Sequence, residues 1–390
     1  MLPFPTRRIK EGEALILIPD VEVDEPTKAP VFYNPRMKMN RDSAILAVSA
    51  LHRRVRRPLT LCEPMCGTGV RGIRLALEAE GISEVVMGDL NPHAVELSEA
   101  NIRLNRVSNR VRVRLLEANL LLSLHDRPYG RFDYVDVDPF GSPIPFIDSA
   151  IRACRDGGLL ALTATDMPPL CGLYPEVCLR RYGGLPLRTD YCHEVALRLL
   201  AGALVREAAR HDVAATPFFS YAADHYIRLY AQLEEGARKA DKRLGELGYI
   251  LHCPNCLHRE TAYEYPSGRV CPRCGSRMML GGPLWLGPLS DPGFCSEMLS
   301  IARSRVGLDK RLPRILKLSM EEAELPPTFY NIDVVCSRLG LSSLPTELVV
   351  SALREAGYRA SRTHIHGRGV KTEASIGELE EVLRGIEYER

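Results

Sequence analysis

The chain has 390 residues, of which 45% are hydrophobic and 26% charged, and its formal net charge is +2. This length suffices for two or three domains whose cores need no disulfide bonds. The near-neutral charge excludes a polycation that binds nucleic acid by charge alone. Of the 51 basic residues 43 are arginine, which grips phosphates and stacks on bases, although a GC-rich genome or a hot habitat gives the same bias.

Neither a run of 18 apolar residues nor a signal-peptide pattern occurs. We therefore expect a cytoplasmic protein without a membrane span.

The first 40 residues are rich in proline and charge, with one strand-like run at 14–19. Helical periodicity follows at 43–55, and apolar strands then alternate with amphipathic helices. The strands are expected at 59–65, 83–90, 111–119, 132–138, 158–166 and 225–234, with helices at 70–81 and 91–105. Such alternation predicts an α/β fold with a parallel, doubly wound sheet.

The alternation weakens near 236–250, so we expect two domains. Residues 1–240 form a Rossmann-like domain with an N-terminal extension, and residues 241–390 form a C-terminal α+β region. That region is expected to contain a cysteine-rich ribbon at 251–278. Residues 325–390 read as two helices, short strands and a final helix, which resembles a winged-helix module.

A glycine-rich turn follows the first strand of the alternation. Gly67, Gly69 and Gly72 give the pattern G-x-G-x-x-G at the start of a helix, where backbone can approach a ligand closely. Asp89 ends the next strand, where a carboxylate can bind ribose hydroxyls. A dehydrogenase and an S-adenosylmethionine-dependent methyltransferase would both show this turn. Alternatively, the segment is a tight turn that binds no ligand.

Three features favour the methyltransferase. Glu63 precedes the turn, residues 89–105 combine an acid with Asn-Pro and a polar helix, and DPFG ends the strand at 132–138. An exocyclic amine on a base is a poor nucleophile, so an acceptor such as Asp138 must orient its N–H and take its proton. Phe140 can stack the base, and Pro139 fixes the turn.

Other interpretations of the DPFG segment stay open. Asp138 could simply cap the following helix. The motif also suits methylation of adenine N6 or of a protein amide, and a non-catalytic RNA-binding protein could keep the fold as a relic. The cysteine that methylation of pyrimidine C5 requires does not follow this strand.

Two Cys-x-x-Cys pairs lie 14 residues apart, and we expect them to bind structural Zn²⁺ through four thiolates. The predicted ligands are Cys253, Cys256, Cys271 and Cys274. Four sulfurs leave no open position for catalysis; an iron site or redox thiols are the alternatives. The insert between the pairs is expected to form strand, turn and strand.

A basic cluster lies near the C-terminal end of the sequence, and it is either a phosphate-binding patch or a solvated charged face. Its members are Arg359, Arg362, His364, Arg368 and Lys371.

The segments VFYNPRMKMNRD, EPMCGTGVRGIR, DVDPFGSPIPFIDSA, LTATDMPPLCG and SRTHIHGRGVKTEA resemble the Trm1 family of tRNA (guanine-N2)-dimethyltransferases. The resemblance covers nearly the whole chain. It implies transfer of methyl groups from S-adenosylmethionine to N2 of guanine 26 in tRNA, giving N2-methyl- and N2,N2-dimethylguanosine. The implied partner is tRNA, with no obligate protein partner.

The resemblance also implies roles for single residues. The implied cofactor contacts are Arg41, Glu63, Gly67, Gly69, Arg71, Asp89 for the ribose, and Glu117 and Ala118 near the adenine. Asp138 would accept the amine proton, and Phe32 with Phe140 would hold a guanine flipped out of its stack. Phe32 could instead be ordinary core. His193 and Glu194 are assigned to packing or a tRNA contact.

Overall fold

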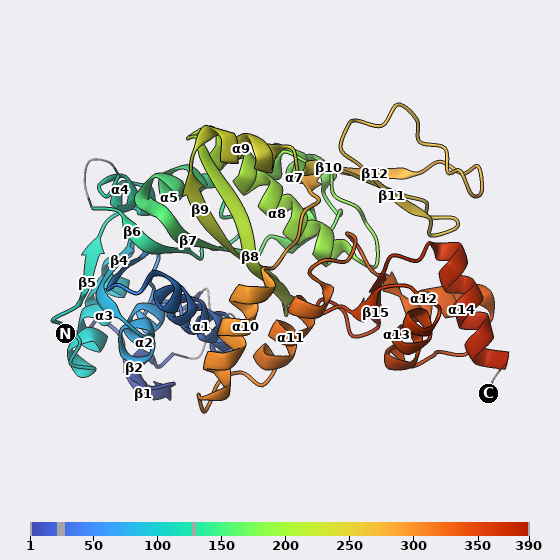
Figure 1. Cartoon of the computed structure of the whole chain (residues 1–390). Helices are drawn as coiled ribbons and strands as arrows, with labels where there is room; N and C mark the ends of the chain where they lie inside the picture. The colour runs from blue at the N-terminus through green and yellow to red at the C-terminus, as the bar shows by residue number, and fades with distance from the viewer. Residues whose placement is uncertain (1, 22–27, 127–129, 389–390) are drawn as a thin grey trace. The chain divides into compact units, whose positions relative to one another are not determined.

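The computed structural model describes residues 2–21, 28–126 and 130–388, which form two compact units (Figure 1). The first unit contains 1–163, 230–235 and 297–313. The second contains 164–229, 236–296 and 314–390.

A seven-stranded sheet has the strand order β5-β4-β3-β6-β7-β9-β8. Its strands are β3 (Leu59–Glu63), β4 (Ile82–Asp89), β5 (Val111–Leu115), β6 (Phe132–Val137), β7 (Cys154–Ala164), β8 (Val213–Ala223) and β9 (Tyr226–Glu235). The ladders that join β5, β4, β3, β6 and β7 are parallel, which confirms the predicted sheet. Only β8 was not predicted.

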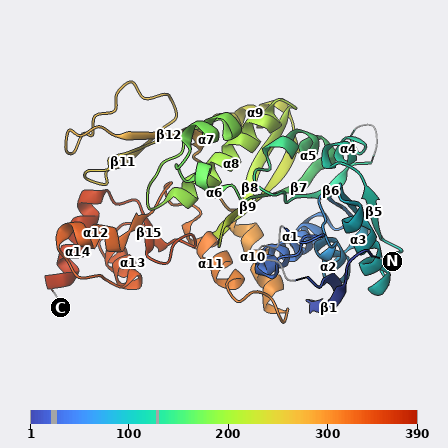
Figure 2. The same ribbon diagram turned by 180° about the vertical axis from the view of Figure 1, so that it is seen from behind.

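Helices cover both faces of the parallel strands. Those on one side are α1 (Lys38–Val55), α2 (Val70–Glu78) and α3 (Pro92–Leu104), and those on the other are α4 (Ala118–Ser123) and α5 (Ile147–Ala153) (Figures 1 and 2). Helix α3 begins where Pro92 fixes the first turn and the Asn91 side chain accepts from the His93 N–H at 3.0 Å.

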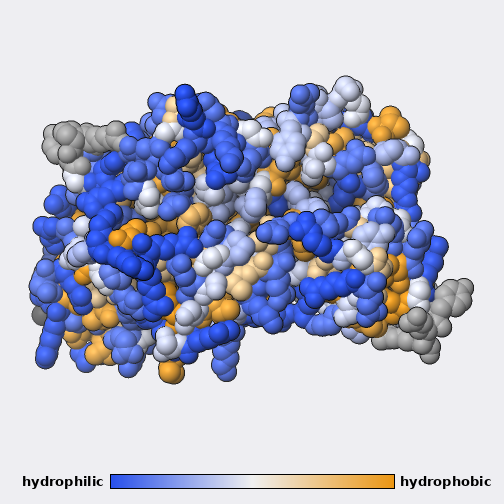
Figure 3. Space-filling model, viewed as in Figure 1, coloured by the Kyte–Doolittle hydropathy of each residue, from blue (hydrophilic) through white to orange (hydrophobic). Residues whose placement is uncertain are grey.

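No helix within the described ranges has both the length and the apolar character needed to cross a bilayer. The face of the molecule shown in Figure 3 is mostly hydrophilic, with apolar side chains in small groups.

The N-terminal extension forms an antiparallel hairpin of β1 (Thr6–Glu11) and β2 (Ala14–Pro19). The side-chain oxygens of Asn101 on α3 and of Asn105, which caps the end of that helix, accept from the N–H groups of Leu17 and Leu15 at 2.7 and 2.9 Å. The predicted run at 14–19 is therefore a strand. Its partner β1 was not predicted because its sequence, TRRIKE, has few apolar residues.

The second unit contains most of the remaining elements. Its helices include α6 (Met167–Leu170), α7 (Pro175–Tyr182), α8 (Cys192–Ala209), α9 (Ala237–Leu244), α12 (Ile332–Leu339), α13 (Thr346–Glu355) and α14 (Ile376–Tyr388), while α10 (Pro292–Arg303) and α11 (Leu312–Glu322) span the division. One three-stranded sheet is β11 (Arg259–Ala262), β10 (Leu247–His252) and β12 (Met279–Trp285). The other is β13 (Tyr330–Asn331), β15 (Gly369–Thr372) and β14 (Ala360–Arg362).

At 325–390 the structure has the expected two helices, short strands and final helix, preceded by the short strand β13, which was not expected. It also corrects the cysteine-rich insert. The first half of the insert forms β11, but this strand pairs with β10, which precedes the insert. The second half contributes only the isolated bridge between Val270 and Arg277. The predicted hairpin within the insert is therefore wrong, because the longer apolar strand β10 is the better partner.

The second unit begins at Ala164, well before the expected domain boundary at 240. Helix α8 explains the difference, because it packs on β12 of the ribbon. Arg198 donates to the carbonyls of Trp285 and Gly287 at 3.0 and 2.9 Å, and a Cβ at Gly202 would lie 3.2 Å from the Leu284 Cα.

A buried ion-pair network joins α8 to the C-terminal module within this unit. Lys371, only 4% exposed, lies 2.9 Å from a Glu194 carboxylate oxygen and 3.8 Å from Glu322. Arg198 also pairs with Glu194 at 2.9 Å, and His364 pairs with Glu322. Burial raises the pKa of Glu194, but Lys371 and Arg198 outweigh it and hold that pKa at about 2.

Removal of the Lys371 charge should therefore destabilise the protein. Lys371→Met leaves two buried carboxylates, Glu194 and Glu322, with less compensation, and breaking such a pair costs about 3–5 kcal/mol. The matched control is Lys317→Met, because Lys317 is 68% exposed and lies 3.8 Å from Glu321. Urea unfolding should show a much lower midpoint for the first variant and an almost unchanged one for the control. Equal midpoints for the two variants would contradict the role of the network.

Candidate functional site

The candidate site lies where β3, β4 and β6 end. Because these strands are parallel neighbours, their carboxyl ends meet at one edge of the sheet. Glu63 ends β3, Asp89 ends β4, and Asp138 follows β6. The acids expected around a cofactor and a substrate amine are thus on adjacent strands.

The glycine turn between β3 and α2 is built for close backbone approach. Gly67 and Gly69 have φ values of 54° and 73°, a left-handed conformation that side chains disfavour. A Cβ at Gly72 would lie 2.3 Å from the Met87 sulfur. The Gly67 N–H donates to Asp89 at 2.8 Å, and the Asn91 N–H donates to the other Asp89 oxygen at 2.9 Å. Asp89, the predicted ribose ligand, therefore also fixes the shape of the turn.

Arg71 is the centre of the site. Its Nε lies 3.1 Å from Glu63, one terminal nitrogen lies 3.2 Å from Asp136, and the other donates to Asp138. The first terminal nitrogen also donates to the Asn40 side chain at 2.6 Å. Three acidic side chains share one guanidinium, so acids outnumber the basic group and the cluster suits a positively charged ligand.

Glu63 is the most strongly perturbed acid of this cluster. Burial raises its pKa to about 8, Arg71 opposes the shift, and the nearby charge of Asp136 adds to it. One Glu63 oxygen also accepts from the Gly72 N–H at 2.9 Å. The pKa of Glu63 therefore lies far above the ordinary value of 4.5. A cation beside it would lower that pKa.

Two aromatic rings stand next to Asp138. The Phe32 and Phe140 ring centroids are 4.8 Å apart and the rings are nearly perpendicular, at 88°. Phe140 is 66% exposed, an unusual state for a large apolar ring at the end of a buried strand. Phe32 is half-buried. This arrangement brings together the two rings predicted to hold a base.

Arg41, a predicted cofactor contact, lies in a buried ion pair. Its guanidinium makes two 2.6 Å hydrogen bonds to Glu11 and a third, at 3.2 Å, to the Asn34 carbonyl. Burial raises the pKa of Glu11, but Arg41 and Arg74 outweigh it and bring that pKa to about 2. The pair fastens the N-terminal hairpin to α1, so in this structure the guanidinium is committed to Glu11.

Glu117 and Ala118, predicted near the adenine, lie at the start of α4. The Glu117 side chain caps this helix by accepting from the Leu120 N–H at 3.0 Å, and Ala118 is buried. That these two residues contact the adenine stays a prediction. The capping bond of Glu117 is a role that the sequence did not indicate.

Sequence reasoning missed several members of the site. Asn40 and Asp136 contact Arg71, and Glu11 contacts Arg41. Asp136 is fully buried and accepts from the Tyr134 hydroxyl at 2.5 Å. The two aspartates inside the buried strand β6, Asp133 and Asp136, were the available signal, because buried carboxylates are rare unless they are paired.

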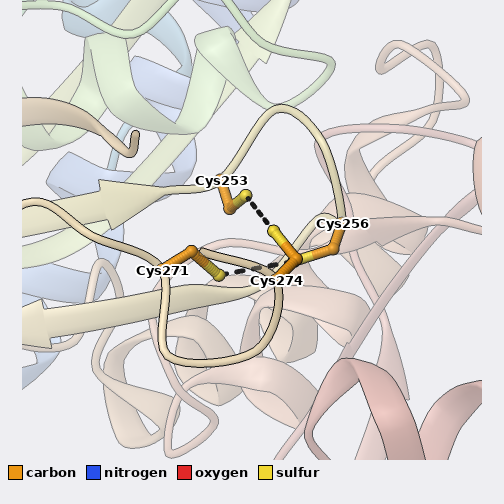
Figure 4. A group of neighbouring side chains, drawn as sticks. All are labelled: Cys253, Cys256, Cys271 and Cys274. Atoms are coloured by element: carbon orange, nitrogen blue, oxygen red, sulfur yellow. Dashed lines mark hydrogen bonds between the residues drawn. The ribbon is translucent and has the colours of Figure 1, made fainter. Parts of the chain in front are cut away.

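The four cysteines of the ribbon converge (Figure 4). The Cys253–Cys274 and Cys256–Cys271 sulfur pairs are each 3.5 Å apart, and all four sulfurs lie within 4.8 Å of one another. Zinc–thiolate bonds of about 2.3 Å at tetrahedral angles place sulfurs about 3.8 Å apart. The residues present therefore fit a closed four-sulfur site.

The predicted RNA-binding cluster is divided by the fold. His364 and Lys371 are buried in the ion-pair network of the second unit, so the prediction that they contact phosphates is not supported. Arg359, Arg362 and Arg368 remain at the surface, and each pairs with a carboxylate. Charge along the sequence did not reveal the buried partners, Glu194 and Glu322, because they lie far away in the sequence.

Comparison with known proteins extends these findings. The profile of the N2,N2-dimethylguanosine tRNA methyltransferase family matches residues 12–384. The chain is 42% identical to tRNA (guanine(26)-N(2))-dimethyltransferase of Methanothermobacter thermautotrophicus, over 97% of this chain and 98% of the relative. It is 37% identical to the tRNA (guanine(26)-N(2)/guanine(27)-N(2))-dimethyltransferase of Aquifex aeolicus, over 97% and 95%.

A solved structure is similar over almost the entire chain. It is the complex of Trm1 from Pyrococcus horikoshii with S-adenosyl-L-methionine, with a TM-score of 0.85 and 36% identity, over 96% of this chain and 99% of that one.

The raised pKa of Glu63 predicts a pH-dependent stability. The folded-state value, about 8, exceeds the ordinary 4.5, so the stability from holding this proton is full below pH 4.5 and is lost as the pH rises through 8. Glu63→Gln mimics the protonated side chain and does not titrate. Its free energy of unfolding, measured with urea at several pH values, should therefore increase relative to the parent protein across this window.

The control for this experiment is Glu80→Gln. A hydrogen bond from Arg53 lowers the pKa of Glu80, so that group titrates below the window. Its stability difference from the parent should stay constant from about one pH unit above 4.5 up to pH 8, where the side chain is ionised in both states. A constant difference for Glu63→Gln as well would show that Glu63 is ionised in the folded protein.

Proposed function

Because the chain belongs to the N2,N2-dimethylguanosine tRNA methyltransferase family, we propose that it methylates N2 of guanine 26 in tRNA with S-adenosylmethionine as donor. The product is N2-methyl- and then N2,N2-dimethylguanosine. The observation that carries the proposal is the Asp138-Pro139-Phe140 turn at the end of β6, with Arg71 bound to Asp138. Relatives that match 97% of the chain and are named for this activity support it.

The residues around the glycine turn fit the donor. The glycine turn lies at the N-terminus of α2, and Asp89 lies where ribose hydroxyls bind in this fold. The negative cluster of Glu63, Asp136 and Asp138 complements a sulfonium cation. When bound, S-adenosylmethionine supplies an electrophilic methyl group.

Asp138 prepares the amine of the substrate. Its side chain is 16% exposed, so one oxygen can face a base while the other is held by Arg71. A carboxylate that accepts a hydrogen bond from the N2–H group orients the lone pair of the nitrogen toward the methyl group. As the nitrogen acquires the methyl group and positive charge, Asp138 takes its proton and later releases it to water.

Arg71 is a positioning residue in this scheme. It fixes the Asp138 side chain, and its contact with Glu63 links the substrate side of the site to the cofactor side. Asn40 holds the guanidinium from α1. An acceptor that is already oriented needs no rearrangement when charge develops on the nitrogen.

Phe32 and Phe140 hold the target base. A guanine inside folded tRNA must leave its stack to reach the donor, and exposed aromatic faces recover part of the lost stacking energy. The perpendicular arrangement offers one ring face and one ring edge. After the first transfer one N–H remains, and rotation about the C2–N2 bond presents it to Asp138 for the second.

The cysteine ribbon is proposed to hold structural Zn²⁺. Four thiolates complete a tetrahedral ligand set, which leaves no position for substrate. The proposed role is to fix β10, β11 and the loops that follow them. The exposed rings of Tyr263 and Tyr265 on this insert, with Arg359, Arg362 and Arg368, form the proposed tRNA-contacting surface of the second unit.

The decisive test is identification of the modified nucleoside. Unmodified tRNA transcript, incubated with the protein and S-adenosylmethionine, should yield dimethylguanosine by mass spectrometry of the digest. A transcript with adenine at position 26 should yield none. Asp138→Asn should lower kcat by about 10²–10⁴-fold, the usual contribution of a positioned acid or base, while binding of S-adenosylhomocysteine persists.

The matched control is Asp148→Asn, since Asp148 is 50% exposed on α5 and pairs with Arg152. It should retain full activity. Methylated adenosine as the product, or full activity of Asp138→Asn, would refute the proposal.

Removal of the exposed Phe140 ring should weaken stacking on the target base. Phe140→Ala should lower kcat/KM for tRNA by about 5- to 150-fold, since stacking contributes about 1–3 kcal/mol per base. Phe140→Tyr should keep most of the activity. The control is Val306→Ala, which trims a fully exposed apolar side chain. A Phe140→Ala enzyme with normal kcat/KM would remove this residue from the substrate site.

A further inference from the structure

A second group of metal-ligating side chains lies in the second unit, outside the cysteine ribbon. The Sγ atoms of Cys171 and Cys192 and a ring nitrogen of His193 all lie within 4.8 Å of one another. The Cys192 Sγ is 3.7 Å from the His193 Nδ1. The proposed methyl transfer uses none of these three residues.

The backbone holds the two segments together. The Cys171 N–H donates to the Met167 carbonyl at 2.8 Å, and the Cys192 N–H donates to the Thr189 carbonyl at 3.2 Å, where α8 begins. Gly172 has a φ of 88°, and a Cβ there would lie only 2.9 Å from the Arg188 backbone nitrogen. The chain crosses itself closely at Gly172 and Arg188, which brings the two thiols to one place.

We propose that Cys171, Cys192 and His193 form a binding site for a divalent metal ion of the zinc class, distinct from the four-cysteine ribbon. Two sulfurs and one imidazole nitrogen are a ligand set that zinc prefers. Bonds of about 2.3 Å to sulfur and about 2.0–2.1 Å to nitrogen, at a tetrahedral angle, separate the two atoms by about 3.6 Å. The observed 3.7 Å between Cys192 and His193 agrees with this geometry.

The site would differ from the ribbon in its coordination. The two cysteines are half-buried and His193 is exposed, so solvent can reach the fourth position. The ion would close the loop that runs from Cys171 to Cys192 and contains α7. Cross-linking the ends of a loop restricts the unfolded chain, so metal should stabilise this segment.

A disulfide between Cys171 and Cys192 is the competing use of the two thiols. The metal site accounts better for the structure because the imidazole of His193 is a third donor that points at the same pair. A disulfide would give that imidazole no role. The two possibilities predict different metal contents and different masses of the chain.

Metal content per chain tests the proposal. The full chain is saturated with Zn²⁺, and weakly held ions are removed by gel filtration. Inductively coupled plasma mass spectrometry should then find two zinc ions per chain. After the same gel filtration, Cys171→Ser/Cys192→Ser and His193→Ala should each carry one zinc ion. In a Zn²⁺ titration, the affinity of His193→Ala for the second ion should be at least about tenfold lower than that of the parent chain. Cys253→Ser/Cys271→Ser should also keep one, which separates the two sites.

The matched control is Cys178→Ala, which removes a nearby buried thiol outside the group. It should retain two ions. His193→Ala alters an exposed side chain, so its result does not depend on refolding of a core. When Co²⁺ replaces Zn²⁺, the thiolate-to-Co²⁺ absorption of Cys171→Ser/Cys192→Ser should be lower than that of the parent chain.

Two outcomes would overturn the proposal. One is a single zinc ion in the parent chain that survives replacement of Cys171, Cys192 and His193. The other is a chain whose mass without reductant is lower by two hydrogens than its mass with reductant, together with a proteolytic fragment in which Cys171 is linked to Cys192. That result would identify a disulfide in place of the metal site.

Discussion

The contact of Arg71 with three carboxylates is the constraint on which the rest of the site depends. Glu63, Asp136 and Asp138 come from the ends of two neighbouring strands, and they could not share one small buried volume without a cation between them. One guanidinium cannot neutralise three acids, and burial together with the charge of Asp136 raises the pKa of Glu63. This imbalance favours binding of a cation, which suits the sulfonium group of the proposed methyl donor.

The N-terminal extension supports the same cluster from outside the sheet. Glu11 on the hairpin pairs with Arg41 on α1 and with Arg74 on α2. Arg41 and Asn40 are consecutive on α1, so the pair that fastens the hairpin also fixes the helix from which Asn40 reaches Arg71. The extension also carries Phe32 to its place against Phe140. Buried ion pairs and the contact of Phe32 with the exposed ring of Phe140 therefore connect the extension to the proposed cofactor and substrate sides.

The parts that could be predicted from the sequence are those encoded by neighbours along the chain. Strand and helix periodicity predicted the parallel sheet, and local spacing predicted the glycine turn and the four cysteines of the ribbon. Pairings across long separations could not be predicted in this way. Lys371 and His364 looked like a surface patch because their partners, Glu194 and Glu322, are 177 and 42 residues away. The role of Asn40 was hidden for the same reason, since its partner lies on another helix.

The two cysteine groups also differ in whether the sequence could reveal them, because one is formed by neighbours along the chain and the other by distant residues. In the ribbon, each pair of ligands is three residues apart, and a tight turn alone can bring the sulfurs together, so the spacing is itself a signal. Cys171 and Cys192 are 21 residues apart, and no short-range pattern marks them. They meet because Gly172, without a side chain, lets the chain pass within contact of Arg188 before α8 begins. A glycine that looks like an ordinary turn in the sequence thus determines whether two distant thiols can act on one ion, and only the folded backbone reveals it.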